Sequence, residues 1–405
     1  GADAGEDPVH HADAGAGRRD EGAHLGHEDD QRHLAHVGGL ARHVGAGDDG
    51  HPVLLLPHEG VVGDEEAVLE HLLHHRMAAV VDLDGPRLVH RGAAVVVPHR
   101  HRREGHQGVH LRHRGGSPLD AMKAIAVGTT SSAPLASYMG KEIGGALPSM
   151  AAIPTTAGTG SEVTKFTIIT DTKTDVKMLL KGEVLLPQLA IVDASLSEST
   201  PQSVTAATGL DALTHAIEAY TSKQAQPLTD ALAVSAVKRI FSYLPAAYRD
   251  GKNRKAREEM AAAALEAGIC INNSSVTIVH GMSRPIGALF HVPHGLSNAM
   301  LLEKCLQFAL PGCYERFGAL GRAIGAAPAD SSDAAAADAL LAAVKQLCRT
   351  CEVPSPEQYG ISRTAFFDVI EKMSADAIAS GSPGNTRRAV SAADCAAIYR
   401  SFWET

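Results

Sequence analysis

The chain has 405 residues and a formal net charge of −9, which is long enough for two or three domains. It has no basic run that predicts nucleic-acid or anionic-membrane binding, and no apolar stretch approaches the roughly 20 residues of a membrane span. The polar first residues do not resemble a secretion signal, and six widely spaced cysteines do not form a disulfide framework. We therefore expect a cytoplasmic protein without nucleic-acid or membrane partners.

The composition changes sharply near residue 114. Of the 22 histidines, 18 lie in residues 1–114, a segment that lacks Phe, Tyr, Trp, Asn, Cys, Ser, Thr, Ile and Lys. Protein cores depend on aliphatic and aromatic side chains, so this composition does not predict a compact fold. Apolar runs at 53–56 and 93–97 are short enough to be strands, but no hydrophobic period is sustained around them.

The residue types of this anomalous segment suggest an origin. Every type in residues 1–114 except Met77 can be encoded by a triplet that starts with G or C. In a GC-rich gene the third codon position is nearly always G or C, and a shifted or antisense reading moves that position to the front. We therefore interpret the segment as a translation in the wrong reading frame. A disordered extension and a metal-buffering, histidine-rich module are the alternatives.

From Gly115 onward the patterns are those of an ordinary folded chain. Residues 120–127 predict a helix after a glycine turn, and residues 147–153 and 188–193 predict strands. Helices are then predicted at 201–222, 228–249, 254–271, 274–289, 296–309 and 333–351. Strands alternating with helices, followed by helices alone, predict an α/β nucleotide-binding domain at 115–199, incomplete at its N-terminus, and an all-α metal-binding domain at 200–405.

The few histidines after residue 114 predict a metal site. Asp211 and His215 are four residues apart on a predicted helix, so both side chains leave the same face. His280 and His294 are the other candidate ligands. One carboxylate and three imidazoles suit Fe²⁺ or Zn²⁺ and leave a coordination position for a substrate oxygen. Taken singly, each could instead be a hydrogen-bonded histidine without a metal.

Five sequence strings resemble the iron-containing alcohol dehydrogenase family, in that family's order and spacing. They are GGSPLDAMKAIA, AAIPTTAGTGSEVT, GLDALTHAIEAY, VHGMSRPIGALFHVPHG and SNAMLL. The resemblance runs from Gly115 to about Phe308 and continues more loosely to the end. It implies that Asp211, His215, His280 and His294 bind the metal, and it leaves His291 outside the ligand set.

The resemblance also implies a site for NAD, with NADP left open, between two domains. Its expected residues are a glycine turn opening a helix, a Thr/Gly loop, and a lysine at the nicotinamide ribose: Gly115, Gly116, Ser117, Asp120, Thr155, Thr156, Thr159, Ser161 and Lys177. The family usually has a third glycine where this chain has Arg114. The strands and helices that should hold the adenosine half are not recognisable upstream.

The implied activity is reversible oxidation of a small alcohol to an aldehyde or ketone, by a homo-oligomer, with the metal acting as Lewis acid. His291 is a candidate proton relay. Arg284 stands where many relatives have histidine, and it predicts substrates with an acid group unless it forms an ion pair with Glu218. The rival functions are an inactive metal-binding protein, a hydroxyacid–oxoacid transhydrogenase and a dehydratase-like sugar-phosphate enzyme.

Overall fold

The computed structural model describes residues 93–97, 109–112, 116–171 and 176–403, with only the backbone described at 93–97, at 109–112 and at positions 116 and 176. The chain divides into the units Gly1–His51 and Pro52–Thr405, and the first lies wholly outside the described residues. Of residues 1–114, which we interpret as a translation in the wrong frame, the structure describes only the two short strands at 93–97 and 109–112. One of these, at 93–97, matches an apolar run noted in the sequence.

The α/β part is built around one helix, α3 (Gly116–Thr130). A sheet of order β2-β1-β3-β6 contains β1 (Ala93–Val97), β2 (Val109–Arg112), β3 (Ser149–Ile153) and β6 (Leu189–Ala190). In this sheet β1 runs antiparallel to β2 and β3, and β3 runs parallel to β6. A separate hairpin pairs β4 (Phe166–Asp171) with β5 (Val176–Lys181).

Two faces of α3 bury different partners. Leu119, Met122 and Ala126 pack with Met150 of β3 and its neighbour Ala152. The adjacent face packs on the hairpin through a second cluster: Ala124, Val127, Ile143, Ile169, Met178, Leu180 and Leu185. Because both stripes of α3 are buried, the helix is fixed between β3 and the hairpin, and the loop that follows β3 is fixed with it.

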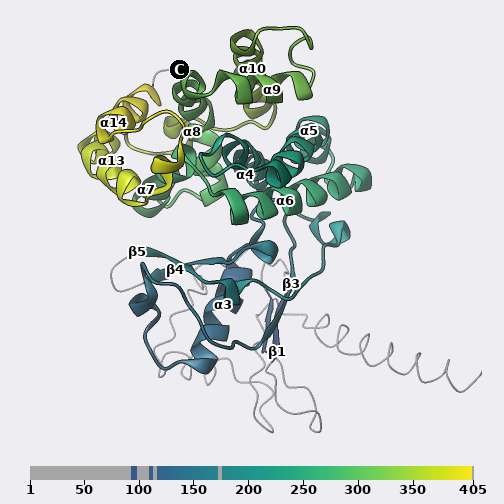
Figure 1. Ribbon diagram of the computed structural model, residues 1–405, viewed down its shortest axis with the longest axis vertical. Coiled ribbons are helices and arrows are strands. Elements are labelled where there is room, and N and C mark those ends of the chain that lie inside the picture. Colours follow the sequence, from purple (N-terminus) through teal and green to yellow (C-terminus); the bar gives the residue numbers. More distant parts are fainter. Residues whose placement is uncertain (1–92, 98–108, 113–115, 172–175, 404–405) are drawn as a thin grey trace, which may run out of the picture. The chain divides into compact units, whose positions relative to one another are not determined.

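The helical part surrounds α4 (Gln202–Thr221), whose residues from 209 onward are buried on all sides. Its main neighbours are α5 (Pro227–Arg249), α6 (Arg254–Ser274) and α8 (His294–Ala309) (Figure 1). The remaining helices are α7 (Ile278–Phe290), α9 (Tyr314–Ala323), α10 (Asp333–Thr350), α11 (Pro356–Tyr359), α12 (Arg363–Asp368), α13 (Ile370–Ala379) and α14 (Ala392–Ser401).

The predicted fold class, an α/β part followed by a helical part, is confirmed. The helix predicted at 120–127 lies within α3, and each later predicted helix corresponds to one of α4–α8 and α10. The strand predicted at 188–193 is only two residues long, and the β4–β5 hairpin was not predicted. Within the described part of the chain no single helix has the length and apolar character of a membrane span. The one consecutive pair that reaches both together, α6 and α7, is bent by 103°.

The loop after β3 lies against α6 at a point where neither backbone carries a side chain. Gly160 has a φ of +62°, and a Cβ built on it would lie 2.5 Å from the Cα of Gly268. The Lys165 N–H donates to Asn272 Oδ1 at 2.8 Å a short way further along the same two segments. Only glycine fits this approach, so the Thr/Gly loop is held close to the helical part.

Candidate metal centre

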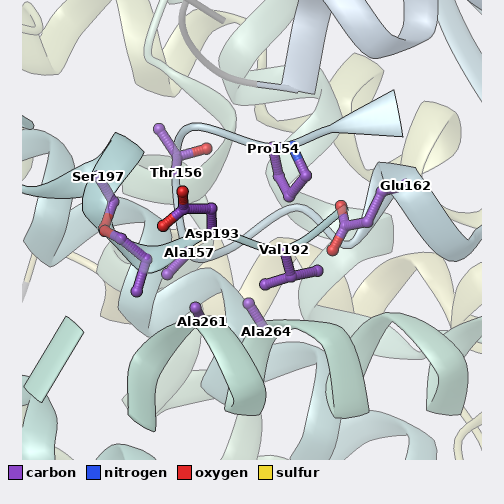
Figure 2. Close-up of a pocket in the computed structure, with 10 residues that line it drawn as sticks. Pro154, Thr156, Ala157, Glu162, Val192, Asp193, Ser197, Ala261 and Ala264 are labelled. Carbon is purple, nitrogen blue, oxygen red and sulfur yellow. The ribbon is translucent and has the colours of Figure 1, made fainter. Parts of the chain in front are cut away.

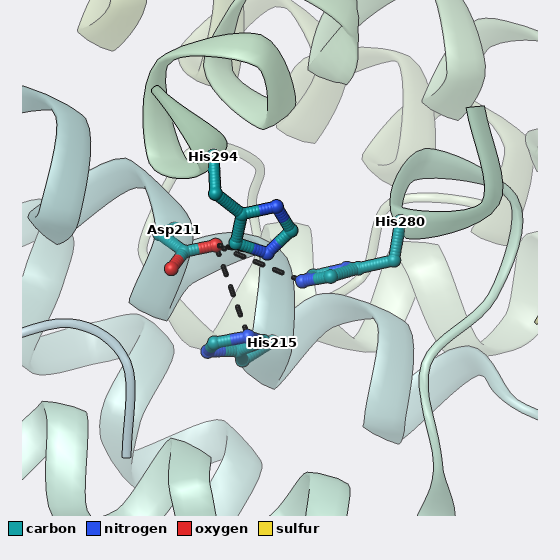
Figure 3. A group of neighbouring side chains, drawn as sticks. All are labelled: Asp211, His215, His280 and His294. Atoms are coloured by element: carbon teal, nitrogen blue, oxygen red, sulfur yellow. Dashed lines mark ion pairs between the residues drawn. The ribbon is translucent and has the colours of Figure 1, made fainter. Parts of the chain in front are cut away.

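Four predicted ligands come together from three helices. Asp211 and His215 project from α4, His280 from α7, and His294 is the first residue of α8 (Figure 3). Asp211 Oδ1 is 3.8 Å from His215 Nε2, 3.7 Å from His280 Nε2 and 3.9 Å from His294 Nε2. All four candidate ligand atoms lie within 4.8 Å of one another.

These separations fit a single divalent cation. Four ligand atoms at about 2.0–2.2 Å from one ion stand about 3.5 Å apart when tetrahedral. The distances from Asp211 Oδ1 to the three imidazoles, 3.7–3.9 Å, are close to that value. One carboxylate oxygen and three imidazole nitrogens are also a donor set that Fe²⁺ and Zn²⁺ accept. The residues present therefore fit the metal that the sequence implies.

The cluster is an electrostatically coupled group in a desolvated place. Burial alone would raise the pKa of Asp211, but the imidazoles of His215, His294 and His280 hold that pKa well below its usual range. Burial lowers the pKa of His215. For His280, burial opposes the Glu218 and Asp211 carboxylates, which raise its pKa to about 8. A carboxylate that stays ionised among imidazoles is ready to bind a cation.

Glu218 contacts this site, although the sequence did not assign it there. Its carboxylate is 1% exposed and accepts hydrogen bonds from Thr277 Oγ1 at 2.7 Å and the Val279 N–H at 2.6 Å. It also contacts His280 Nδ1 at 2.5 Å. An ionised carboxylate only accepts, so Nδ1 carries the proton and Nε2 presents its lone pair to the cluster. The i, i+4, i+7 spacing of Asp211, His215 and Glu218 is the signal that could have identified it.

Asn298 is the second residue that was missed. Its side chain on α8 is fully buried, and Nδ2 donates to Asp211 Oδ1 at 2.7 Å. The same amide nitrogen lies 3.1 Å from His280 Nε2 and 3.3 Å from His294 Nε2. Asn298 therefore contacts three of the four candidate ligands and fixes the orientation of the Asp211 carboxylate.

The cluster is accessible from one side. The His294 side chain is 36% exposed, whereas those of Asp211, His215 and His280 are at most 5% exposed. His294 is therefore the member of the cluster with the most contact to solvent. His291, the predicted proton relay, is exposed at the C-cap of α7 with a φ of +54°, and it is not one of the clustered residues.

Arg284 lies on α7 one turn after His280. Its Nη1 donates to Ser382 Oγ at 3.0 Å, and its Nε is buried without a hydrogen-bond partner. Among the described residues it forms no ion pair, so the pairing with Glu218 that the sequence allowed is not present. Burial lowers the pKa of Arg284.

The predicted cofactor residues divide between α3, the loop after β3 and β5. Gly115 lies outside the described residues; α3 begins at Gly116, and Ser117 is exposed at its start. Asp120 Oδ1 accepts from Ser161 Oγ at 2.6 Å, which ties the helix to the loop. In that loop, Thr159 Oγ1 accepts from the Ser161 N–H at 3.3 Å.

The loop also carries an uncommitted polar group. Thr155 is 2% exposed, and its Oγ1 is buried without a partner. Lys177 lies on β5, and a Cβ built at Gly287 of α7 would be 3.2 Å from its Nζ. The unpaired hydroxyl belongs to the loop and the lysine to β5, and both are polar groups that a ligand can satisfy. They fit the ribose and phosphate groups of a dinucleotide.

Lys123 positions this loop and was not identified from the sequence. Its side chain is fully buried, and Nζ donates to the carbonyls of Thr164 and Phe166, each at 2.7 Å. It also donates to Thr164 Oγ1 at 3.1 Å and Ser161 Oγ at 3.4 Å. Burial lowers the pKa of Lys123 to about 8. One buried lysine thus joins α3 to the end of the Thr/Gly loop.

A small pocket opens where this loop meets α6 (Figure 2). Its lining includes the predicted cofactor residue Thr156 and two acids that were not predicted, Glu162 and Asp193, with Ala261 and Ala264 forming the α6 side. Glu162 Oε2 is buried without a partner. None of the four clustered residues lines the pocket, so it is separate from the metal centre.

An α/β part with a Thr/Gly loop, joined to a helical part with a buried Asp/His cluster, defines a two-part protein with a candidate metal centre. Comparison with known proteins gives the particular family. The profile described as iron-containing alcohol dehydrogenase matches residues 115–194, and the profile described as Fe-containing alcohol dehydrogenase family, C-terminal, matches residues 205–403. The chain belongs to the iron-containing alcohol dehydrogenase family.

Individual relatives agree with this assignment. The probable alcohol dehydrogenase EutG of Escherichia coli (strain K12) is 43% identical over 58% of this chain and 59% of its own length. The NAD-dependent methanol dehydrogenase of Bacillus methanolicus is 38% identical over 60% of this chain and 64% of its own length. The crystal structure of a 1,3-propanediol oxidoreductase matches with a TM-score of 0.69 and 36% identity, covering 71% of this chain and 75% of that one. The chain thus spans less than two thirds of these two curated relatives.

Proposed function

We propose that the protein is a metal-dependent, NAD(P)-linked alcohol dehydrogenase that interconverts a small alcohol and its aldehyde or ketone. The observation that carries the proposal is the buried Asp/His cluster, open at His294. The family relationship supports the reaction class, and the methanol dehydrogenase relative supports NAD as the cofactor. Hydroxy acids are among the alcohols that we propose, because Arg284 lies one turn from His280.

In this proposal one divalent cation is held by Asp211, His215, His280 and His294. The family favours Fe²⁺, and the donor set also accepts Zn²⁺. When bound, the cation supplies Lewis-acid polarisation of the substrate oxygen and lowers the pKa of the alcohol. The chain itself contributes preorganisation. Glu218 keeps the proton of His280 on Nδ1, and the closely packed walls around three of the four ligands exclude water from all but the His294 side.

We assign nucleotide binding to the start of α3, the Thr/Gly loop and Lys177. The N-terminus of α3 offers unpaired backbone N–H groups to phosphate oxygens. Thr155 Oγ1 offers an uncommitted hydroxyl, and Lys123 holds the loop in place. For the proton, we propose exchange with solvent through His291, because an imidazole can both donate and accept a proton and this residue is exposed three positions before His294.

The decisive experiment measures metal content and turnover together. The full chain, loaded anaerobically with Fe²⁺, is assayed for propan-1-ol oxidation by the appearance of NADH. His215→Ala and His280→Ala should lose both bound metal and turnover, because each leaves three ligands at most. Thr229→Val, which removes a buried hydrogen bond to Ser274 on α6, is the matched control and should retain both. Full metal content in both histidine variants would refute the assignment. Metal binding without any NADH binding would instead identify an inactive metal-binding protein.

A further inference from the structure

Arg284 lies on the same face of α7 as a candidate metal ligand. At about 100° per residue, positions 280, 284 and 287 fall within about 60° of arc around the helix. His280 belongs to the cluster, and Arg284 follows it by one turn on the same face of α7. Arg284 therefore lies beside the cluster.

The hydrogen bonds of Arg284 are incomplete. A guanidinium has five N–H donors, yet within the described part of the chain this one makes a single hydrogen bond, to Ser382 Oγ, and no ion pair. Its Nε is buried with no acceptor. The acid whose charge reaches it, Glu218, already accepts from Thr277 and Val279 on one oxygen and contacts His280 with the other. The Arg284 side chain is partly buried, and a cation with so little contact to solvent is normally paired; among the described residues this one has no carboxylate within ion-pair distance.

The local charge balance points the same way. Two carboxylates, Asp211 and Glu218, offset the two charges of a divalent cation, while His280 and the other imidazoles are neutral as ligands. Arg284 is then in excess, and Lys177 Nζ adds a second positive charge against the same face, beside Gly287. The site as a whole favours a ligand that carries a negative charge.

We infer that the substrate is an alcohol or aldehyde bearing a carboxylate, and that Arg284 binds that carboxylate while the hydroxyl or carbonyl end faces the metal cluster. The inference rests on the proposed function and adds the substrate class to it. Arginine suits this role because its planar fork matches the two oxygens of a carboxylate. The hydrogen bond from Nη1 to Ser382 Oγ restricts the orientation of the guanidinium.

The test compares a hydroxy acid with its neutral isostere. The full chain, loaded with Fe²⁺, oxidises 4-hydroxybutyrate or 4-hydroxybutanamide with NAD⁺, and kcat/KM is measured for each. The wild-type chain should prefer the acid. Arg284→Gln should lower kcat/KM for the acid by about 10–100-fold, the worth of a charged hydrogen-bonded pair, and for the amide by less than about threefold. Arg284→Lys keeps the positive charge but loses the planar guanidinium. Its kcat/KM for the acid should lie between the values of the wild-type chain and of Arg284→Gln.

Three controls make the outcomes decisive. Arg322→Gln removes a partly exposed arginine that is paired with Asp333, and it should change kcat/KM for neither substrate. Calorimetric binding of butyrate to the metal-loaded chain tests carboxylate binding by Arg284 without turnover. A failure of this inference can therefore be distinguished from a failure of the proposed function. Loss of NAD⁺ affinity in Arg284→Gln with an unchanged acid-to-amide ratio would assign the anion to the cofactor phosphates and overturn the inference. Equal losses for both substrates, or no preference for the acid in wild type, would also overturn it.

Discussion

Replacing Glu218 by glutamine tests how much of the metal affinity comes from residues behind the ligands. The change keeps the shape of the side chain but replaces one acceptor oxygen by an NH₂ donor. Three donors converge on this group, from Thr277, Val279 and His280. If the amide oxygen stays with the first two, its NH₂ opposes the N–H of His280. That imidazole must then move its proton to Nε2, the atom that faces the cluster.

The magnitude follows from this tautomer conflict. Removing a hydrogen-bond partner behind a metal-binding histidine typically lowers metal affinity by about 10–100-fold, or about 1.4–2.7 kcal/mol. Loss of a buried, charged acceptor should also lower the free energy of unfolding, by about 1.5–3 kcal/mol. Both effects should therefore be measurable in a single variant.

Competition with a chromophoric chelator for Co²⁺ or Zn²⁺ measures the affinity, and urea unfolding in excess chelator measures the stability. Thr229→Val is again the control, since it removes a buried hydrogen bond of 2.7 Å to Ser274 that involves none of the four candidate ligands. It should lose stability and keep metal affinity. A folded Glu218→Gln chain that binds metal within about twofold of wild type would refute the reasoning.

Three further predictions follow from the described contacts and from the composition. Asn298→Leu removes the donor to Asp211 and should weaken metal binding about tenfold in the same competition assay; unchanged affinity would contradict its positioning role. Gly268→Ala places a Cβ 2.7 Å from the Cα of Gly160 and should raise the Kd for NADH about tenfold at unchanged metal content. A fluorescence titration that gives an unchanged Kd would disprove this prediction. In the coding DNA, a one- or two-base correction near codon 114 should restore a strand–turn–helix pattern upstream. The absence of any open alternative frame there would defeat this interpretation.

The helices and the Asp211/His215 pair could be predicted because their signals are local, whereas His280 and His294 joined the predicted ligand set through the family resemblance. Asp211 and His215 are one helical turn apart, and the later helices have sustained hydrophobic periods. Glu218 shares their face, but its role depends on His280, 62 residues away, and Asn298 meets Asp211 over 87 residues. Contacts at such separations depend on how helices pack, which no single-helix pattern specifies.

The β4–β5 hairpin was missed for a different physical reason. In β4 the polar Thr167 is fully buried, because its Oγ1 donates to the Asp120 carbonyl at 2.8 Å. The apolar neighbour Ile168 is 36% exposed. Alternation of apolar and polar residues is the usual signal of a half-buried strand, and here the buried face is occupied in part by a hydroxyl. The contact of Arg284 could not be predicted for the reason that applies to Glu218 and Asn298: its partner Ser382 lies 98 residues away in the sequence.

The uneven burial of the four ligands has a consequence for how the protein gains and loses its metal over time. Three ligand side chains are enclosed, and His294 alone lies at the exposed edge. Dissociation should therefore begin with His294 swinging outward, and the ion should leave by the path that the substrate uses to enter. Bound substrate would then slow metal exchange simply by standing in the exit. A chain loaded with metal and substrate together would then hold its ion longer than one loaded with metal alone.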